Sequence, residues 1–326
     1  MTTGIQWTDV TWNPIAGCSM VSPGCTNCYA MKQAHRNAAM GMAKYTGLTQ
    51  ISGGRPVWTG KVRMADRRTL EGPLHRKIKT RYFVNSMSDL FHEDVTGDQL
   101  AAIFGVMVQC PQHTFQILTK RSLVMRDWMN KPDSHEMVAE YAKVAAEDLP
   151  WPPKNVWLGV SAESQERADE RVPDLLQTRA AVRFVSAEPL LGPIDFARLC
   201  GGDWDAMTGR FYPCLGEDKT PALDWVIVGG ESGHGARDCN VDWVWQIAKD
   251  CRWYEVPVFV KQLGRFPVQE LAEFENSGWP DGTIQITPKD DPKCAHLQLH
   301  DPKGGNMEEW PRAHCIREFP EVVYAG

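Results

Sequence analysis

Seven short apolar segments recur along this chain of 326 residues, and helical patterns separate most of them. The segments cover residues 5–12, 82–85, 114–118, 155–160, 182–185, 224–228 and 256–260. Nearly continuous apolar strands are typical of a parallel sheet that helices cover. The pattern therefore predicts an α/β fold, a partial (β/α)6-type barrel of parallel strands in which a seventh strand follows six strand–loop–helix units. A doubly wound open sheet is the alternative. Pro257 predicts an edge position for the last strand.

Polar residues follow every strand of this repeat after the first one. The carboxyl ends of all strands in a parallel barrel open on one face, and the active site of such enzymes lies there. Serine and aspartate also cap helices, which explains any single cluster. Acids and lysines that recur at six strand ends exceed what capping needs, so this face is the predicted site. The clusters contain Ser88, Asp89, Thr119, Lys120, Ser161, Glu163, Ser186, Glu188, Glu231, Ser232, Lys261 and Gln262.

Three cysteines follow the first predicted strand within eleven residues. Cys18, Cys25 and Cys28 have the spacing C-x6-C-x2-C, and a Ser-Pro-Gly turn separates the first two. A structural zinc site normally has four ligands. Three thiolates on one loop instead suit a [4Fe–4S] cluster in which one iron stays open for another ligand. Zinc with a distant fourth ligand such as His35, and unrelated core thiols, remain alternatives at this point.

The composition sets limits on compartment and partners. The formal charge is −6, which excludes a surface that binds polyanions throughout. Residues 61–81 are locally basic, either as a solvated face or as a patch for a phosphorylated or nucleic-acid partner. The sequence shows neither a signal peptide nor a stretch that could span a bilayer. We therefore expect a cytoplasmic protein without membrane contact, in which clustered cysteines indicate metal or catalysis.

The predicted barrel covers residues 1–265. It includes the cluster loop at 18–28 and an insertion at 190–223 that interrupts the repeat. Residues 266–326 follow the last strand and are rich in turns. We expect them to form a C-terminal extension packed on the barrel.

Several of these segments resemble a known family. The loop 24–29, together with Cys18, resembles the cluster loop of radical S-adenosylmethionine enzymes, although its first spacing is longer than the common C-x3-C-x2-C. Most of the chain resembles the phage three-Cys-motif family, which is distantly similar to spore photoproduct lyase. The segments that carry this second resemblance are 117–120, 159–163, 185–192, 225–232 and 259–262.

The resemblance implies a radical S-adenosylmethionine enzyme with a [4Fe–4S] cluster. Cys18, Cys25 and Cys28 would bind three irons, and the fourth would bind the amino and carboxylate groups of S-adenosylmethionine. One electron from a flavodoxin- or ferredoxin-like donor would cleave the sulfonium bond. The resulting 5′-deoxyadenosyl radical would take hydrogen from a substrate, for which a nucleotide, a nucleic-acid base or RNA is the expectation.

The resemblance also implies roles for individual residues at the strand ends. Ser88 and Asp89 would hold the methionine amino group, and Ser161 would reach the ribose or carboxylate with Glu163 nearby. Gly229 and Gly230 would let the backbone approach adenine closely. The aromatic residue that often precedes the last cysteine is replaced by Asn27. Further contacts to substrate or cofactor are expected from Lys120, Glu188, Glu231 and Lys261.

Two other functions fit parts of the sequence. The first is a zinc-binding, non-enzymatic nucleic-acid-binding phage protein, which requires a fourth ligand near the loop. The second is a hydrolytic barrel enzyme with Glu188 and Glu231 as its two acids. This last reading leaves the thiol loop without a role.

Overall fold

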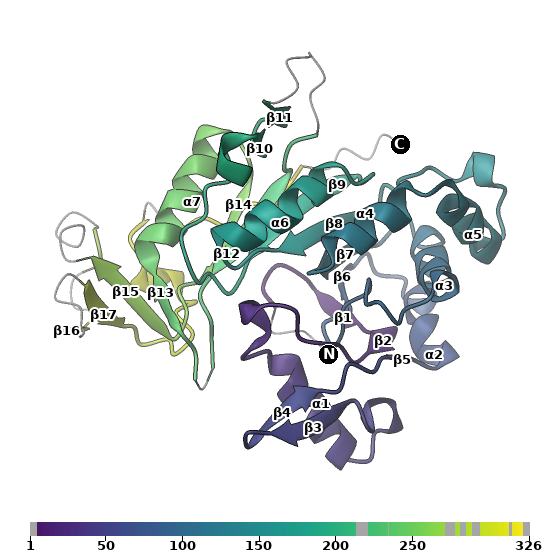
Figure 1. Ribbon diagram of the computed structural model, residues 1–326, viewed down its shortest axis with the longest axis horizontal. Coiled ribbons are helices and arrows are strands. Elements are labelled where there is room, and N and C mark those ends of the chain that lie inside the picture. The colour runs from purple at the N-terminus through teal and green to yellow at the C-terminus, as the bar shows by residue number, and fades with distance from the viewer. Residues whose placement is uncertain are drawn as a thin grey trace. The chain divides into compact units, whose positions relative to one another are not determined.

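A computed structural model describes residues 5–212, 221–233, 235–270, 278–280, 285–288, 294–312 and 315–321. Its main sheet has seven strands in the order β1-β6-β7-β8-β9-β12-β14 (Figure 1). The pairings within β1–β8 and within β9–β14 are parallel. The predicted α/β class with a partial barrel of parallel strands is therefore confirmed. The strands are β1 (Val10–Trp12), β6 (Arg81–Val84), β7 (Thr114–Thr119), β8 (Val156–Ser161), β9 (Val182–Ala187), β12 (Trp225–Gly229) and β14 (Val258–Gln262).

The two end strands of this sheet differ in detail from the prediction. The first strand was expected over residues 5–12, but only Val10–Trp12 pairs with β6. The preceding residues form a turn, and Thr8 Oγ1 donates to the Arg81 carbonyl at 2.9 Å. Pro257 lies just before β14, which occupies the end of the strand order as predicted. Residues 316–318 hydrogen-bond to the outer side of β14, so this edge is covered.

The chain divides into two compact units. The first comprises Met1–Val160 and Gln177–Arg183, and the second comprises Ser161–Leu176 and Phe184–Gly326. The cysteine loop belongs to the first unit. The strand ends after β8 belong to the second.

In the first unit, helices follow β6 and β7. α3 (Gly97–Val108) begins with a capping box between Thr96 and Gln99, and α4 (Ser122–Asn130) leads into α5 (Pro132–Ala142). α3 packs on α5, and a Cβ at Gly105 would lie 2.7 Å from Tyr141 Cβ. A glycine there therefore permits the close helix contact seen in Figure 1.

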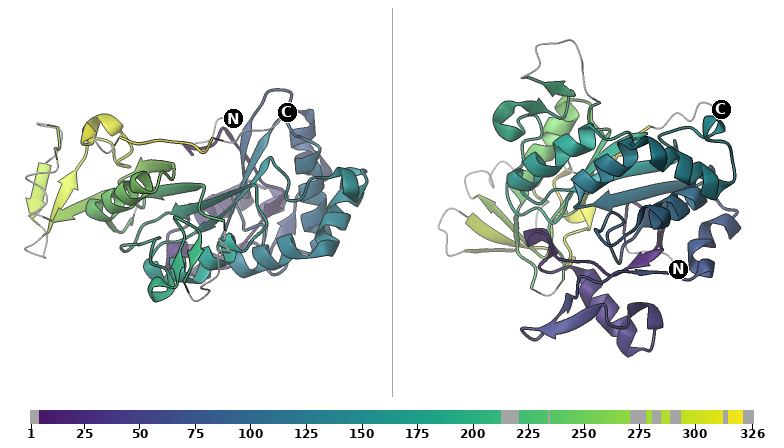
Figure 2. Two further views of the ribbon diagram at one scale, coloured as in Figure 1. Left: turned by 90° about the horizontal axis from the view of Figure 1, so that it is seen from above. Right: turned by 45° about the vertical axis from the view of Figure 1, so that its right-hand side comes forward.

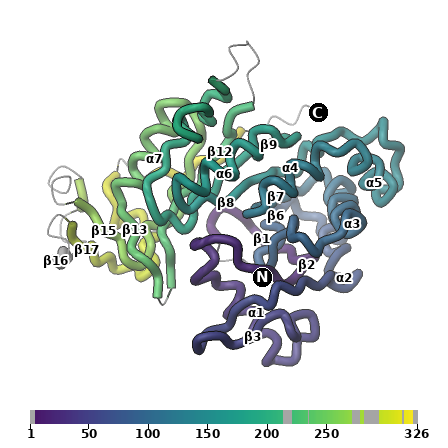
Figure 3. The backbone as a smooth tube through the Cα atoms, in the orientation of Figure 1, coloured from purple at the N-terminus to yellow at the C-terminus, as the bar shows by residue number. Residues whose placement is uncertain are grey.

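Residues 15–70 of the first unit form a smaller layer outside the main sheet. α1 (Tyr29–Ala39) packs on the hairpin of β3 (Thr49–Ser52) and β4 (Arg55–Trp58), as the backbone trace in Figure 3 shows. β2 (Ile15–Ala16) pairs antiparallel with β5 (Arg63–Met64), and α2 (Arg67–Leu70) follows. The core of this layer consists of Ala16, Ala30, Met31, Ala34, Tyr45, Leu48, Trp58 and Met87.

The second unit contains α6 (Gln165–Leu176) and α7 (Val241–Trp253), and α7 packs against β14 and β15 (green helix in Figure 2). Its second sheet has the order β13-β15-β17-β16, so the predicted C-terminal extension shares a sheet with residues that precede α7. The insertion at 190–223 forms a short hairpin, and its residues 213–220 lie outside the described part. The strands are β10 (Trp204–Asp205), β11 (Arg210–Phe211), β13 (Asp238–Asn240), β15 (Phe266–Glu270), β16 (Gln285–Pro288) and β17 (Cys294–Gln298).

No described helix is both long and apolar enough to cross a membrane.

Candidate functional site

The cysteine loop is tied to the first parallel strand and to the turn after the second. Asn13 follows β1 directly, and its Oδ1 accepts hydrogen bonds from Ser86 Oγ (3.1 Å) and from the Met87 amide (3.0 Å). The Gly17 amide then donates to the Met87 carbonyl at 3.1 Å. Cys18 therefore stands at the carboxyl end of a parallel strand pair, as the repeat predicted.

Gly17 is required where the loop begins. Its φ is +96°, a backbone conformation that residues with a side chain rarely adopt. A Cβ at this position would overlap the Lys61 carbonyl oxygen. Only glycine can therefore occupy position 17, where the cysteine loop begins and the backbone passes close to the Lys61 carbonyl.

Turns connect the second and third cysteines. The Cys25 amide donates to the Ser22 carbonyl at 2.9 Å, and the Cys28 amide donates to the Cys25 carbonyl at 3.2 Å. Cys28 is the N-cap residue of α1. The predicted turn through Ser22 and Pro23 is thus confirmed, and it places two thiols one short turn apart.

The thiols of Cys18 and Cys28 pack against the apolar core of this layer. Burial raises the pKa of the Cys18 thiol to about 12, and the Asp89 carboxylate adds to the shift. Burial also raises the pKa of Cys28, to which the neighbouring Cys25 contributes. Since Cys28 interacts electrostatically with both other thiols, the three cysteines form one group. All three are free thiols and partly accessible.

A buried arginine lies beside this group. Arg121 Nη1 donates toward Cys18 Sγ at 3.8 Å and to Asp89 Oδ2 at 3.1 Å. Its Nη2 donates to Ser19 Oγ at 2.5 Å, and its Nε donates to Glu93 Oε1 at 3.0 Å. Burial by itself would lower the pKa of Arg121, but the carboxylates of Asp89 and Glu93 outweigh it and raise the value. The thiol loop therefore has a permanent positive charge in contact with its first cysteine.

Asp89 already has a full set of hydrogen-bond donors. Its Oδ1 accepts from the Phe91 amide (3.0 Å) and from Thr119 Oγ1 (2.6 Å), while its Oδ2 accepts from the Lys120 amide (3.0 Å) and from Arg121. A carboxylate has about four acceptor sites. A bound ammonium group would therefore have to displace a protein donor, so this geometry favours a positioning role for Asp89 over the predicted cofactor contact.

The other two predicted residues of the first unit lie close to the loop. Ser88 Oγ donates to the Ile15 carbonyl at 3.0 Å, which leaves its oxygen able to accept a further hydrogen bond. The Lys120 ammonium lowers the pKa of Cys28 and so lies within electrostatic reach of it. Ser88 and Lys120 are thus both gathered near the thiols.

Ser161 is the last residue of β8 and Glu163 follows it; both belong to the second unit and are buried. Glu163 Oε2 lies 3.0 Å from Arg171 Nη1, and each side chain is 1% exposed. The same Nη1 donates to the Ser161 carbonyl at 2.8 Å. The arrangement is that of a structural ion pair that ties α6 to the end of β8.

Glu188 and Lys261 form an ion pair of 2.9 Å between the ends of β9 and β14. Ser186 Oγ donates to the other oxygen of Glu188 at 3.2 Å. The side chains of Glu188 and Lys261 are 12% and 22% exposed. A Cβ at Gly229 would lie 3.0 Å from Glu188 Oε1, so this glycine makes room for the carboxylate. Of the four residues Glu163, Glu188, Glu231 and Lys261, this pair has the most exposed side chains.

Glu231 lies at the end of β12 and binds Arg237 through both oxygens, at 3.0 and 2.8 Å. The Arg237 amide also donates to it at 2.9 Å. A Cβ at Gly230 would overlap the Leu263 carbonyl oxygen and lie 2.8 Å from Cys239 Cβ. The close approach at this glycine is thus to the chain itself, and the expected contact with adenine stays a prediction.

Sequence reasoning missed the cationic partners of three acids. Arg121, Arg171 and Arg237 each contact a predicted acidic residue. Arg121 directly follows Lys120 after β7, and this place at a strand end is the only feature of the sequence that could have pointed to it as a site residue. Arg171 lies eight residues and Arg237 six residues beyond its partner acid, distances that no simple sequence rule connects.

Within the described residues, no group of three or more Cys, His, Asp or Glu side chains is arranged to hold a single metal ion. His35, the fourth zinc ligand considered above, has its Nδ1 3.3 Å from Thr49 Oγ1. Thiolates on a four-iron cluster bind different irons and stand further apart than the ligands of one ion.

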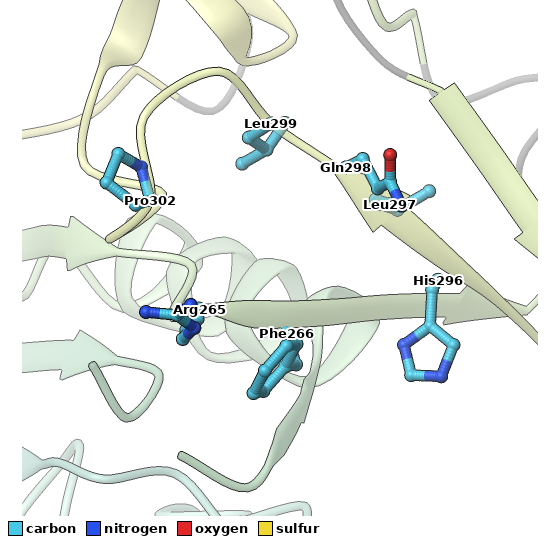
Figure 4. Close-up of a pocket in the computed structure, with 7 residues that line it drawn as sticks. All are labelled: Arg265, Phe266, His296, Leu297, Gln298, Leu299 and Pro302. Carbon is cyan, nitrogen blue, oxygen red and sulfur yellow. The ribbon is translucent and has the colours of Figure 1, made fainter. Parts of the chain in front are cut away.

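A groove of about 450 Å³ lies elsewhere in the second unit, along β15 and β17 (Figure 4). Phe266 of β15 and Arg265, which precedes this strand, line one side of the groove. His296 of β17 also lines it, together with Leu299 and Pro302 from the segment after β17. None of the predicted site residues lines it.

A family model described as a protein of unknown function (DUF5131) matches residues 2–299. The chain belongs to this family. The match covers the cysteine loop, the seven strands of the main sheet and most of the C-terminal extension. Neither the curated proteins nor the solved structures contain a match to this chain. Family membership thus leaves the reaction open, and the site geometry has to carry the functional argument.

Proposed function

We propose that this protein is a radical S-adenosylmethionine enzyme that binds a [4Fe–4S] cluster through Cys18, Cys25 and Cys28. The observation that carries the proposal is a group of three neighbouring thiols on one loop at the carboxyl end of a parallel half-barrel strand. The donor set fits such a cluster, because three thiolates leave one iron open for a further ligand.

The surroundings of the thiols also suit a cluster. Cys18 and Cys28 pack against an apolar cluster that includes Ala16, Met31 and Met87. An apolar shell around a metal centre limits water access and tunes its redox potential. Arg121 adds a fixed positive charge next to Cys18, which offsets part of the negative charge of bound thiolates. When bound, the cluster would supply the electron that cleaves S-adenosylmethionine to methionine and a 5′-deoxyadenosyl radical.

The chain's own residues would position the cofactor and protect the radical. Asp89 holds the Arg121 guanidinium and the Lys120 amide in place. Ser88 offers a hydroxyl oxygen as an acceptor for an ammonium group. The Lys120 ammonium has no hydrogen-bond or ion-pair partner among the described residues, and it would bind the carboxylate of S-adenosylmethionine. In the second unit, Glu188 and Lys261 are the candidates for substrate contact.

A flavodoxin- or ferredoxin-like donor would supply the electron, and a nucleotide or nucleic-acid base would supply the hydrogen atom. Cleavage of one S-adenosylmethionine would take up one electron and release methionine, and hydrogen abstraction would then leave 5′-deoxyadenosine and a substrate radical. The cytoplasm provides both the donor class and the reducing conditions that thiol ligands need.

The test is anaerobic reconstitution with iron and sulfide, followed by reduction in the presence of S-adenosylmethionine. The expected result is visible absorption, about four irons per chain and formation of 5′-deoxyadenosine. Cys25→Ala should lose colour and cleavage, whereas Cys110→Ala, which removes a buried thiol outside the loop, should keep both. A colourless protein that retains one zinc per chain would replace this proposal with the zinc-binding alternative. Cleavage that persists in Cys25→Ala would show that the ligands are wrongly assigned.

A further inference from the structure

The segment of residues 61–81 is strongly basic and largely exposed. It contains eight Lys and Arg residues but only two acids, a formal charge of +6 in a chain whose total is −6. Every residue from 74 to 79 is exposed, and the Ile78 side chain among these cations is 73% exposed. An exposed isoleucine between arginine and lysines is unusual for a face that only contacts water.

The two acids of the segment are engaged locally. Asp66 Oδ1 accepts a hydrogen bond from the Thr69 amide at 2.8 Å, and Glu71 pairs with Arg67 at 2.7 Å. In contrast, the side chains of Lys61, Arg68 and Lys77 form neither a hydrogen bond nor an ion pair with any described residue. Three cations of this surface therefore have no ion-pair partner within the part of the chain that the structure describes.

The segment is also fastened to the base of the cysteine loop. β2 and β5 lie side by side (Figure 1). Ala16 pairs with Arg63, and Ile15 pairs with Met64. The Ala65 amide donates to the Pro14 carbonyl at 2.7 Å. Since Cys18 comes two residues after Ala16, the exposed cations and the thiol loop belong to one continuous piece of the first unit.

We infer that residues 61–79 form a docking surface for the phosphodiester backbone of a single-stranded nucleic acid. This inference rests on the proposed function, for which it names the substrate class and the surface that holds it. Phosphates would be the partners of the unpaired cations Lys61, Arg68 and Lys77, because Lys and Arg supply most nucleic-acid affinity through charge. Leu74 and Ile78, exposed among these cations, account for the single strand, whose unstacked bases offer apolar faces that a duplex hides.

The surface is tested by fluorescence anisotropy on the full-length protein with short labelled oligonucleotides. Three ligands of the same sequence are compared: single-stranded DNA, single-stranded RNA and a duplex. Titrations between about 50 and 200 mM salt give the slope of log K against log salt concentration. The combined Lys61→Gln, Arg68→Gln and Lys77→Gln variant removes three unpaired cations of the surface.

The matched control removes exposed cations of the same types elsewhere, through Lys154→Gln, Arg179→Gln and Lys249→Gln. We expect the surface variant to bind single strands about tenfold or more weakly, with a salt slope that is smaller by about 2. The control should bind like the wild type. Equal binding by both triple variants, or no binding by the wild type, overturns the inference. Tighter binding of the duplex than of either single strand overturns the single-strand assignment. The DNA and RNA arms decide which nucleic acid is preferred.

The outcome can be separated from that of the proposed function. Cys25→Ala should bind oligonucleotides like the wild type, since the surface does not need a cluster. Formation of 5′-deoxyadenosine together with unaltered binding by the surface variant refutes the docking surface alone. Salt-dependent binding that the surface variant loses, without any iron uptake, refutes the radical chemistry alone.

Discussion

The Arg121 guanidinium lies between the Cys18 thiol and the Asp89 carboxylate, 3.8 Å from Sγ and 3.1 Å from Oδ2. Both Arg121 and Asp89 are buried, with side chains 5% and 8% exposed. A cation held in a low-dielectric position acts strongly on its neighbours. The relationship links the end of β7 to the thiol loop, and it predicts an electrostatic role for a residue that the sequence did not single out.

Arg121 should raise the reduction potential of the bound cluster. Arg121→Met combined with Asp89→Asn removes the positive charge without leaving an unpaired buried carboxylate. Because Asp89→Asn by itself removes a negative charge, the double variant is compared with the single Asp89→Asn variant. Relative to that variant, we expect the midpoint potential of the double variant to be more negative by more than about 59 mV, a tenfold change in the one-electron equilibrium. A redox titration of the reconstituted proteins, followed by electron paramagnetic resonance, measures the difference. Arg126→Met, which removes a half-buried arginine of α4 that pairs with Asp127, serves as the control, and equal potentials of the double variant and Asp89→Asn would refute the role.

Gly17 should be more sensitive to substitution than a glycine of similar backbone conformation. Gly41 has a φ of +81° with open space around its Cα, whereas Gly17 has a φ of +96° and faces the Lys61 carbonyl. Gly41→Ala should lower the free energy of unfolding by about 1 kcal/mol through backbone strain alone. Gly17→Ala should lower it by about 3 kcal/mol or more and reduce iron uptake, as measured by urea denaturation and iron analysis. Equal effects of the two substitutions would show that the close approach to Lys61 is unimportant.

The ion pair of Glu163 and Arg171 should act on stability and not on cofactor binding. Arg171→Met removes the cation that is ion-paired with a buried carboxylate, which should cost about 3–5 kcal/mol of the free energy of unfolding. The further change Glu163→Leu should restore much of that loss, because an apolar pair of similar size needs no compensation. Chemical denaturation of the single and double variants measures this. If the double variant is as stable as the wild type but has lost affinity for S-adenosylmethionine, Glu163 binds the cofactor after all.

Alkaline pH should destabilise the second unit through Cys239. Burial raises the pKa of this thiol from 9.0 to about 12 in the folded chain. The folded state therefore holds the proton more tightly, and the corresponding stability is complete below pH 9 and is lost as the pH rises toward 12. Between pH 9 and 11 the wild type should lose about 2 kcal/mol that Cys239→Ala does not lose. Unfolding free energies of both proteins across this range decide the point, and parallel curves would contradict it.

The main strands could be predicted because the signal for each one is local. A strand such as β8 is buried throughout, and its residues up to Val160 form one run without a polar side chain that stops at Ser161. The first strand was predicted too long, since its length depends on where β6 begins to pair with it at Tyr82. Alternation of apolar residues before Val10 carries no information about the partner strand.

The candidate site could be predicted only in part. The thiols of Cys18, Cys25 and Cys28 lie within eleven residues, so a single turn suffices to gather them. The role expected for Asp89 depended instead on whether its carboxylate was already satisfied. Thr119 and Arg121, some thirty residues further along the chain, turn out to supply two of its four donors.

The parallel α/β repeat, the polar strand ends and the thiol loop could be recognised in the sequence, because each depends on residues that are neighbours along the chain. The burial of the acids in ion pairs emerged only from the folded chain. The same holds for the pairing of β2 with β5, which places Arg63 of the basic segment beside the strand that leads into the thiol loop. Contacts between distant segments are set by the packing of the whole unit, and no spacing in the sequence encodes them one by one.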